Sequence, residues 1–437
     1  LTRPMRLQFA LQATPIQPMP DPDVLNIFQK TGVVTDEEMF RKLADAGCNQ
    51  FIFYYSWRGN AKTEMGGTPE DPPTQEQRDK LKLGVELAHK HGLKVMLFTG
   101  WGINATSPNW QTYGYELARM PITNQGWGTY GQSAGLNGGY ADFMAWGHHT
   151  IATKYHTDGV LWDSTGNITQ CENRRIGNGW IDDQGRVRPG FAVRATREVY
   201  RRVYTIYKGE DRQNGVIYNH GGSLWCVNTF ADILNRGEGA PMHAETLKGG
   251  WRPLEEFRAA YSGEPFGVWF SGDNNDFAEL PMRVSTHLAL FQLHGNYHKE
   301  WSIHAVRKAL ANPSYDYKDR PLARLWQVYD WLDWDAETRT FFYYDNQKVV
   351  VQEPDHLLSS AFVSGDGSRA VVCISNLDTE PVKNARVALD FDGMGMKGRS
   401  ITVEDAYLGT VFDIDNGRLL LDEIKRERYR LLKITAE

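Results

Sequence analysis

Several apolar segments of this sequence end in a carboxylate or an amide side chain. In residues 157–167, TDGVLWDSTGN, an apolar run ends in Asp163. Glu238 and Asp273 lie at the ends of two other predicted strands. Two carboxyl groups, one ionised and one protonated, can cleave a glycosidic bond by nucleophilic and acid–base catalysis. We therefore take Asp163 as the candidate nucleophile and Glu238 as the candidate general acid/base.

Each of these carboxylates also has a purely structural interpretation. An Asp at a strand end often caps the turn or helix that follows it. Glu238 could form a salt bridge with Arg236 or Arg252 instead of acting on a substrate. Asp273 competes for either catalytic role, and its Asn- and Asp-rich surroundings allow a calcium loop, although the full EF-hand spacing is absent.

The sequence is rich in aromatic residues, with 14 Trp, 20 Tyr and 19 Phe. Many lie in Gly- and Asn-rich segments, where they suit a sugar site, because a pyranose has apolar C–H faces and a ring of hydroxyls. Roughly half of them have a plainer role as buried residues. The expected substrate-binding residues follow predicted strands or lie in loops: Tyr55, Trp57, Arg58, Trp101, Trp127, Trp162, Asn219, His220, Arg236, Asp273 and Asn274. For His220 a structural role is an equal alternative.

Short apolar segments alternate with helical patterns over the first three quarters of the chain. The predicted strands cover residues 6–15, 49–57, 94–103, 157–163, 215–224, 231–240, 265–273 and 296–303. Helix starts are marked by possible capping boxes at Thr35–Glu38 and Thr74–Gln77. This α/β pattern predicts a (β/α)8 TIM barrel over residues 1–337, whose strand ends would share one face. An open doubly wound sheet is the alternative, but no G-x-G-x-x-G follows the first strand.

The pattern changes after about residue 338. Short β-rich segments and the turn signals at 365–367 and 415–417 replace the helical periodicity. We expect residues 338–437 to form a small antiparallel β-sandwich domain. The long polar loops at 104–137 and 164–189 of the first domain are expected to carry function.

Charge and cysteine usage exclude several classes of protein. The net charge of -6 gives no overall basic surface for nucleic acid, and no segment is long and apolar enough to span a membrane. No zinc, P-loop or G-x-S-x-G motif occurs, so we expect no metal and no cofactor. Cys48 and Cys373 are expected to be buried thiols, whereas a disulfide between Cys171 and Cys226 is left open.

Residues 159–163, GVLWD, resemble the fourth strand of retaining TIM-barrel glycoside hydrolases of the α-galactosidase and family 31 clans. In those clans an Asp after strand four is the nucleophile and an acid after strand six is the acid/base. The resemblance implies these roles for Asp163 and Glu238, and a C-terminal β-sandwich. The clans usually have Asp as the acid and a Lys before the nucleophile, and this sequence has neither.

Residues 11–15, LQATP, are similar to the start of the barrel in uncharacterised bacterial glycosidase-like families near family 123. That similarity implies a β-sandwich partner on the N-terminal side, outside this chain. Family 123 enzymes use an adjacent Asp–Glu pair and the acetamido group of the substrate, but Ser164 follows Asp163 here. An inverting or substrate-assisted N-acetylhexosaminidase-like enzyme is therefore an alternative.

The sequence thus predicts an extracytoplasmic glycosidase that acts on an oligo- or polysaccharide, and the resemblance to the two clans implies a retaining mechanism. The chain opens with Leu1, which suggests a processed or fragmentary product whose targeting segment is not visible. A catalytically silent carbohydrate-binding barrel is the main alternative. A lyase or isomerase with His220 as base is another.

Overall fold

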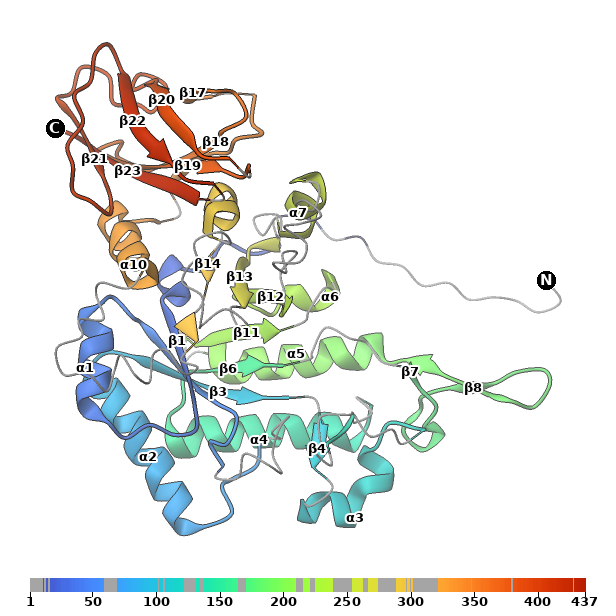
Figure 1. Ribbon diagram of the computed structural model, residues 1–437. Coiled ribbons are helices and arrows are strands. Elements are labelled where there is room, and N and C mark those ends of the chain that lie inside the picture. Colours follow the sequence, from blue (N-terminus) through green and yellow to red (C-terminus); the bar gives the residue numbers. More distant parts are fainter. Residues whose placement is uncertain are drawn as a thin grey trace.

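The structure is a computed structural model of the 437-residue chain. It describes residues 11, 13, 14, 16–58, 69–100, 102–104, 107–121, 131–133, 137–163, 170–209, 215–220, 225–238, 254–261, 266–273, 288–295, 297–298, 300–301, 321–335, 337–346, 348–378, 380–426 and 428–437. The first part is a mixed α/β unit built on a parallel sheet, and the last hundred residues form antiparallel sheets (Figure 1).

The central sheet has nine strands in the order β14-β13-β12-β11-β6-β3-β2-β1-β15. Its members are β1 Ile27–Thr31, β2 Gln50–Tyr54, β3 Lys94–Thr99, β6 Gly159–Trp162, β11 Val216–His220, β12 Ile233–Glu238, β13 Trp269–Asp273, β14 Tyr297–His298 and β15 Glu300–Trp301. All of their pairings are parallel. Only residue 299 separates β14 from β15 in sequence, yet they lie at opposite ends of the strand order, so the sheet curls round.

Helices cover the outer face of this sheet: α1 Glu37–Asp45, α2 Gln75–Lys90, α4 Gly139–Tyr155, α5 Val193–Lys208, α6 Trp225–Asn228, α7 Leu254–Tyr261 and α10 Pro321–Leu332. A further helix, α3 Pro108–Leu117, lies in the segment after β3 and packs on α4. Alternate strand residues explain the packing, because successive side chains point to opposite faces. Phe51 of β2 meets Phe40 of α1 edge to face, with ring centroids 5.0 Å apart. Val160 and Ile217 likewise join a buried cluster with residues of α4 and α5.

One of the two predicted capping boxes is present. The Thr74 hydroxyl accepts from the Gln77 amide, and the Gln77 side chain accepts from the Thr74 amide, so α2 begins as predicted. The capping box predicted at Thr35–Glu38 is wrong, because the N-cap of α1 lies one residue later. Asp36 caps α1 instead, accepting from the Met39 amide at 3.2 Å.

The first strand is also not where the sequence pattern placed it. Most of residues 6–15 lie outside the described residues, and β1 is Ile27–Thr31. The segment before β1 instead packs on the amino end of the sheet. Gln17 Nε2 donates to the carbonyls of Ala231 and Gly267, each at 2.9 Å, and Trp269 Nε1 donates to the Pro20 carbonyl. Six of the other predicted strands are confirmed, with bounds that shift by a few residues, and the predicted strand at 296–303 is divided into the two short strands β14 and β15.

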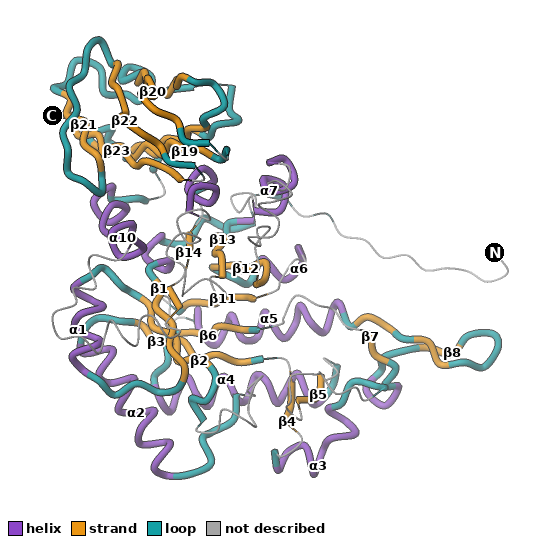
Figure 2. The backbone as a smooth tube through the Cα atoms, in the orientation of Figure 1, coloured by secondary structure: helices purple, strands orange, loops and turns teal. Residues whose placement is uncertain are grey.

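Both predicted long loops contain ordered elements. The first holds α3 and the pair β4 Gly102–Asn104 and β5 Gly131–Ser133. The second forms a projecting arm, residues 170–191, with strands β7 Gln170–Cys171, β8 Trp180–Ile181, β9 Val187–Arg188 and β10 Gly190–Phe191. Figure 2 shows this arm reaching away from the helices, and the strand arrows in Figure 1 point to the same side of the molecule.

Two antiparallel sheets follow α10. One contains β16 Arg339–Phe341, β18 Leu358–Val363, β19 Arg369–Asn376, β23 Arg428–Ala436 and β21 Ile401–Asp405. The other contains β17 Val350–Glu353, β20 Val382–Leu389 and β22 Arg418–Ile424. Side chains of both sheets share one buried cluster. The larger sheet also contacts the α/β unit, where Ser375 Oγ donates to the Ala289 carbonyl at 2.6 Å and Phe362 packs on Trp334.

Cys48, Cys171 and Cys373 are free thiols. Cys48 and Cys373 are buried as predicted, and burial raises the pKa of each to about 12. Cys171 is also a buried free thiol, so it forms no disulfide with Cys226. Among the helices that the structure describes, none has the length and apolarity needed to cross a membrane.

Candidate functional site

Asp163 and His220 form a hydrogen-bonded pair at the carboxyl end of the sheet. Asp163 directly follows β6, and His220 is the last residue of the neighbouring strand β11. Asp163 Oδ1 lies 2.5 Å from His220 Nδ1. Their side chains are 22% and 11% exposed, so the pair is largely shielded but reachable from solvent. An ionised carboxylate can only accept, so Nδ1–H is the donor when Asp163 is charged.

Strand register explains why these two side chains meet. Leu161 pairs with Tyr218, which pairs with Ile233, and these three side chains therefore share the inner face. Two residues further along the first two strands, Asp163 and His220 lie on that same face. The backbone amide of Asp163 also donates to the Thr99 carbonyl at 2.7 Å, which fixes the residue against β3.

A second polar cluster on the inner face was missed by the sequence reasoning. The Tyr218 hydroxyl donates to Ser271 Oγ and accepts from Asn235 Nδ2, both at 3.1 Å. Asn235 pairs with His220 on one side and with Ser271 on the other. The signal was present, because Asn235 and Ser271 interrupt apolar strands at positions in phase with the inner face. Buried polar networks of this kind fix side-chain positions when their groups are satisfied.

Two predicted site residues face the wrong way. Trp162 is fully buried on the outer face, where its ring lies 4.8 Å from that of Tyr200 in α5 and 5.3 Å from that of His148 in α4. Asn219 pairs with Trp162 across the sheet and is also fully buried. The predictions that they bind substrate are therefore wrong. Both stand one residue from an inward-facing site residue, so strand alternation sends them outward.

The residues after β2 have a mixed outcome. Trp57 is buried, and its Nε1 donates to the Phe98 carbonyl at 2.7 Å, so it holds the end of β3 and has no open face for a sugar. The prediction for Trp57 is wrong. Tyr55 is half-buried at the end of β2, with its ring against Phe98. Its φ of 41° marks a sharp turn in the chain directly after the strand.

Arg58 belongs to a buried cluster that the sequence did not reveal. Its guanidinium lies 3.4 Å from a carboxylate oxygen of Glu70, and both side chains are almost fully buried. Glu70 also accepts from Ser107 Oγ at 2.7 Å and from Asn109 Nδ2 at 2.5 Å. Glu70 therefore ties the segment after β2 to the start of α3 and holds Arg58 at the carboxyl end of the sheet. Arg58 stays a predicted binding residue.

The remaining predicted site residues are described by backbone only or not at all. Arg236 and Glu238 lie in β12, and Asp273 ends β13. The backbone of Glu238 pairs with that of Asp273 after a register shift that follows Asn235. Their side chains lie outside the described part of the structure, as do Trp101, Trp127 and Asn274. Their roles stay predictions.

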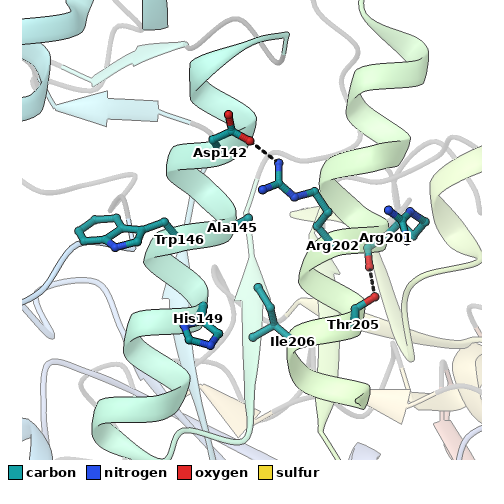
Figure 3. A pocket seen from close by; sticks show the side chains of 8 residues that line it. All are labelled: Asp142, Ala145, Trp146, His149, Arg201, Arg202, Thr205 and Ile206. Carbon is teal, nitrogen blue, oxygen red and sulfur yellow. Dashed lines mark hydrogen bonds and ion pairs between the residues drawn. The ribbon is translucent and has the colours of Figure 1, made fainter. Parts of the chain in front are cut away.

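A groove of about 550 Å³ lies on the helical layer between α4 and α5, and it includes neither Asp163 nor His220. Figure 3 shows Asp142 of α4 directed at Arg202 of α5, an ion pair of 2.8 Å. Trp146 projects from α4 on the side away from α5 (Figure 3). Within the described ranges, no group of three or more His, Cys, Asp or Glu side chains is arranged to hold a metal ion.

No protein-family model matches this sequence, and a comparison with curated proteins gives no match. Solved structures give clear similarities at low identity. A maltogenic α-amylase from Thermotoga neapolitana has a TM-score of 0.61 at 10% identity, over 94% of this chain and 99% of the other. A GH27 β-L-arabinopyranosidase from Geobacillus stearothermophilus has a TM-score of 0.56 at 11% identity, over 97% of each chain.

An α-amylase from Geobacillus thermoleovorans is similar to the same degree, with a TM-score of 0.58 at 11% identity over 94% of this chain and 98% of the other. The chain shares its fold with glycosidases. The similarity extends over almost the whole length, so it includes both the α/β unit and the antiparallel sheets. It concerns the arrangement of elements, whereas the chemistry must be argued from the residues at the strand ends.

Proposed function

We propose that this protein is a glycoside hydrolase that cleaves oligo- or polysaccharides with Asp163 and Glu238 as its catalytic carboxyl groups. The observation that carries the proposal is the inward-facing pair of Asp163 and His220 at the carboxyl end of the fourth strand. Catalytic residues of α/β barrels lie at that end. The fold shared with amylases and an arabinopyranosidase supports this choice of reaction.

In the proposed retaining mechanism, Asp163 attacks the anomeric carbon while Glu238 donates a proton to the departing glycosidic oxygen. A covalent bond forms between an Asp163 oxygen and the sugar as the glycosidic bond breaks. Glu238 then takes a proton from water, the water oxygen attacks the anomeric carbon, and Asp163 is released. His220 Nδ1–H holds Oδ1 of Asp163, which leaves Oδ2 as the attacking oxygen.

The proposal includes two statements about architecture. The curled sheet would close into a (β/α)8 barrel through residues 297–301, because β14 pairs with β13 and β15 pairs with β1. Residues 338–437 would form a β-sandwich domain, since the two antiparallel sheets share one buried cluster. Residues 1–337 would be the catalytic domain.

The test is activity on a panel of aryl glycosides and polysaccharides before and after Asp163→Asn. The change keeps the shape and removes the charge, so we expect kcat to fall by roughly 10³-fold or more. Asp158→Asn is the matched control, because Asp158 lies at the opposite end of the same strand, where it binds His89 and the Val95 amide. Wild-type activity in Asp163→Asn would refute the assignment.

A crystal structure with a bound sugar would test the role of Glu238. Carboxyl groups about 5–5.5 Å apart indicate a retaining enzyme, and about 6.5–9.5 Å an inverting one. Glu238→Gln should lower activity most on substrates with poor leaving groups, because those depend on protonation by the acid. Equal loss on all leaving groups would point to Asp273 or to another acid.

One observation favours a second candidate, a carbohydrate-binding protein without catalysis. The bond of 2.5 Å to His220 already occupies one oxygen of Asp163, and a protonated His220 would neutralise the carboxylate. Glycan binding in calorimetry without turnover of any glycoside would favour this candidate. Turnover that Asp163→Asn abolishes would exclude it.

A further inference from the structure

The arm formed by residues 170–191 is anchored to the segment that follows β3. Asn173 Nδ2 donates to the carbonyls of Tyr115 and Ala118, each at 2.9 Å. The Glu172 amide donates to the Met120 carbonyl at 2.7 Å. Two insertions, one after β3 and one after β6, are thus joined into one body. Because both follow strand ends, this body stands on the same side of the sheet as Asp163.

The outer part of the arm is held together by Asp182. Its carboxylate accepts from the backbone amides of Gln184 and Arg186 and from the guanidinium groups of Arg186 and Arg188, all at 2.9 Å. Hydrogen bonds from Arg186, Gln184 and Arg188 lower the pKa of Asp182 to about 2, so the carboxylate is ionised at any physiological pH. These contacts hold β8, β9 and the turn between them in one fixed arrangement.

The arm and the α3 segment at its base expose large aromatic side chains to solvent. Trp180 is 58% exposed, Phe191 at the base of the arm is 57% exposed, and Tyr115 beside that base is 69% exposed. Ile181 and Val187 are exposed on the opposite face of the two strands. Clustered exposed apolar residues on a projecting element indicate a binding surface.

The chemistry of the Trp180 face favours a carbohydrate over a second protein chain. Trp180 pairs with Arg188 across the two strands, so both side chains leave from the same face, and Asp182, which accepts from the Arg188 guanidinium, lies two residues after Trp180 on that face. The guanidinium of Arg175 lies 6.0 Å from the ring of Tyr115. Such a face offers a stacking surface for the C–H side of a pyranose and charged groups for its hydroxyls.

A second protein copy would need more surface. A stable protein interface buries about 800 Å² on each partner, with an apolar centre and few charges. The Trp180 face consists of one large ring between ionised groups on two short strands, and a single polysaccharide strand needs no larger area. The arm projects on the side of the sheet where the strands end (Figure 1). A ligand that contacts both the arm and Asp163 would therefore be an extended chain.

We propose that the arm, through Trp180 and Arg188, is an accessory binding surface for an extended polysaccharide chain whose reacting unit lies at Asp163. This inference rests on the proposed function for the class of ligand. It adds that the substrate is a polymer rather than a small glycoside, and that the arm holds sugar units away from the bond that is cleaved.

The test is affinity gel electrophoresis of the full chain in gels that contain soluble starch, dextran, galactomannan, arabinan or xylan. We expect at least one polymer to retard the wild-type protein. Trp180→Ala should raise the dissociation constant of the protein for that polymer about two- to tenfold, the usual effect of losing one aromatic contact. Trp180→Phe should restore most of the binding, because it keeps an aromatic face. Trp146→Ala is the matched control, since Trp146 is 54% exposed but lies on α4.

Three results would overturn the inference: no polymer retards the wild-type protein, Trp180→Ala binds as wild type, or Trp146→Ala loses as much affinity. A dimer in light scattering that Trp180→Ala dissociates would assign the surface to a second copy, which also overturns it. Binding does not depend on turnover. Retardation through Trp180 by a protein that hydrolyses no glycoside would refute the proposed function alone. Hydrolysis that Asp163→Asn abolishes, without any effect of Trp180, would refute this inference alone.

Discussion

One hydrogen bond, from His220 Nδ1 to Asp163 Oδ1, joins two neighbouring strands where they end. It fixes the rotamer of a carboxylate whose direction of attack would decide the reaction, because reacting groups must be held within a narrow geometry. In the proposed mechanism His220 would therefore be a positioning residue. On the same inner face, Asn235 pairs with His220 across the sheet and also donates to the Tyr218 hydroxyl, which in turn donates to Ser271.

Replacing His220 should separate its positioning role from a role as a base. An Asn side chain places an amide N–H near the position of Nδ1, so His220→Asn should retain much of the activity. His220→Ala removes the donor, and we expect kcat to fall roughly 10²-fold. Steady-state kinetics on the best substrate of the panel would measure both. Equal activity of the Ala and Asn variants would argue against the positioning role.

Two adjacent histidines of α4 give a prediction on stability. His148 is buried between α4, Trp162 and Tyr207, and burial lowers its pKa to about 3. In the unfolded chain this imidazole binds a proton near pH 6.5, whereas in the folded chain it stays neutral until the pH is much lower. Stability is therefore lost as the pH falls from about 6.5 towards 3, at up to about 1.4 kcal/mol per pH unit from this residue.

The measurement is urea unfolding between pH 4 and pH 8. His148→Asn should unfold more easily at pH 8, but its free energy of unfolding should fall less steeply with acid than that of the wild type. His149→Asn is the control, because His149 is exposed one residue further along the same helix. An unchanged slope in His148→Asn would assign the acid sensitivity to other groups, such as His294, whose pKa burial lowers to about 4.

At the scale of elements, short-range signals located both helix starts, although the cap of α1 is Asp36 and not Thr35. The capping box of α2 was predicted correctly because Thr74 and Gln77 are three residues apart. The predicted first strand was wrong for the opposite reason. Residues 27–31, IFQKT, carry only a weak strand pattern, and β1 is fixed by pairing with β2 on one side and with β15 on the other. No local pattern contains that pairing.

The α2 capping box predicts a defined loss of stability. Thr74→Ala removes the hydroxyl that accepts from the Gln77 amide, and it should cost about 1 kcal/mol of unfolding free energy. Thr205→Ala is the control. Thr205 lies on an exposed position inside α5, where alanine is the better helix former, so its effect should be small or stabilising. Thermal unfolding followed by circular dichroism would compare them, and equal losses would contradict the cap as the cause.

At the scale of the whole molecule, the larger antiparallel sheet is packed against the α/β unit. Phe362 of β18 is fully buried, and its ring lies 4.7 Å from that of Trp334, which follows α10. Ser360 Oγ of the same strand donates to the Leu293 carbonyl at 2.8 Å. Buried contacts from the two parts belong to one continuous cluster. We therefore expect the two parts to unfold together.

Phe362→Ala tests this coupling. The lost ring should cost roughly 3–5 kcal/mol, because the cavity lies in a close-packed region. Differential scanning calorimetry should show one transition that moves to lower temperature as a whole. Val351→Ala, on an exposed position of β17, should change stability by less than about 1 kcal/mol. Two transitions, of which only one moves, would show that the parts unfold independently.

The sequence alone determined the periodicity of the elements and the residues at which they end. Apolar strands alternating with helices gave the parallel α/β class, and the run ending in Asp163 gave the central candidate residue. These inferences succeed because side-chain burial repeats with the period of the local backbone. The change from helical periodicity to short β-rich segments near residue 338 likewise predicted the antiparallel sheets.

Only the tertiary structure decided which side chains meet. Asp163 and His220 turn inward, whereas their neighbours Trp162 and Asn219 turn outward beneath α4 and α5. A shift of one residue reverses the face of every side chain in a strand, and the register depends on partners 57 residues away in sequence, as for this pair. The clusters of Glu70 with Arg58, and of Asn173 with α3, arise in the same way. Long-range strand pairing therefore brings together the candidate site residues, which the local sequence pattern could only suggest one by one.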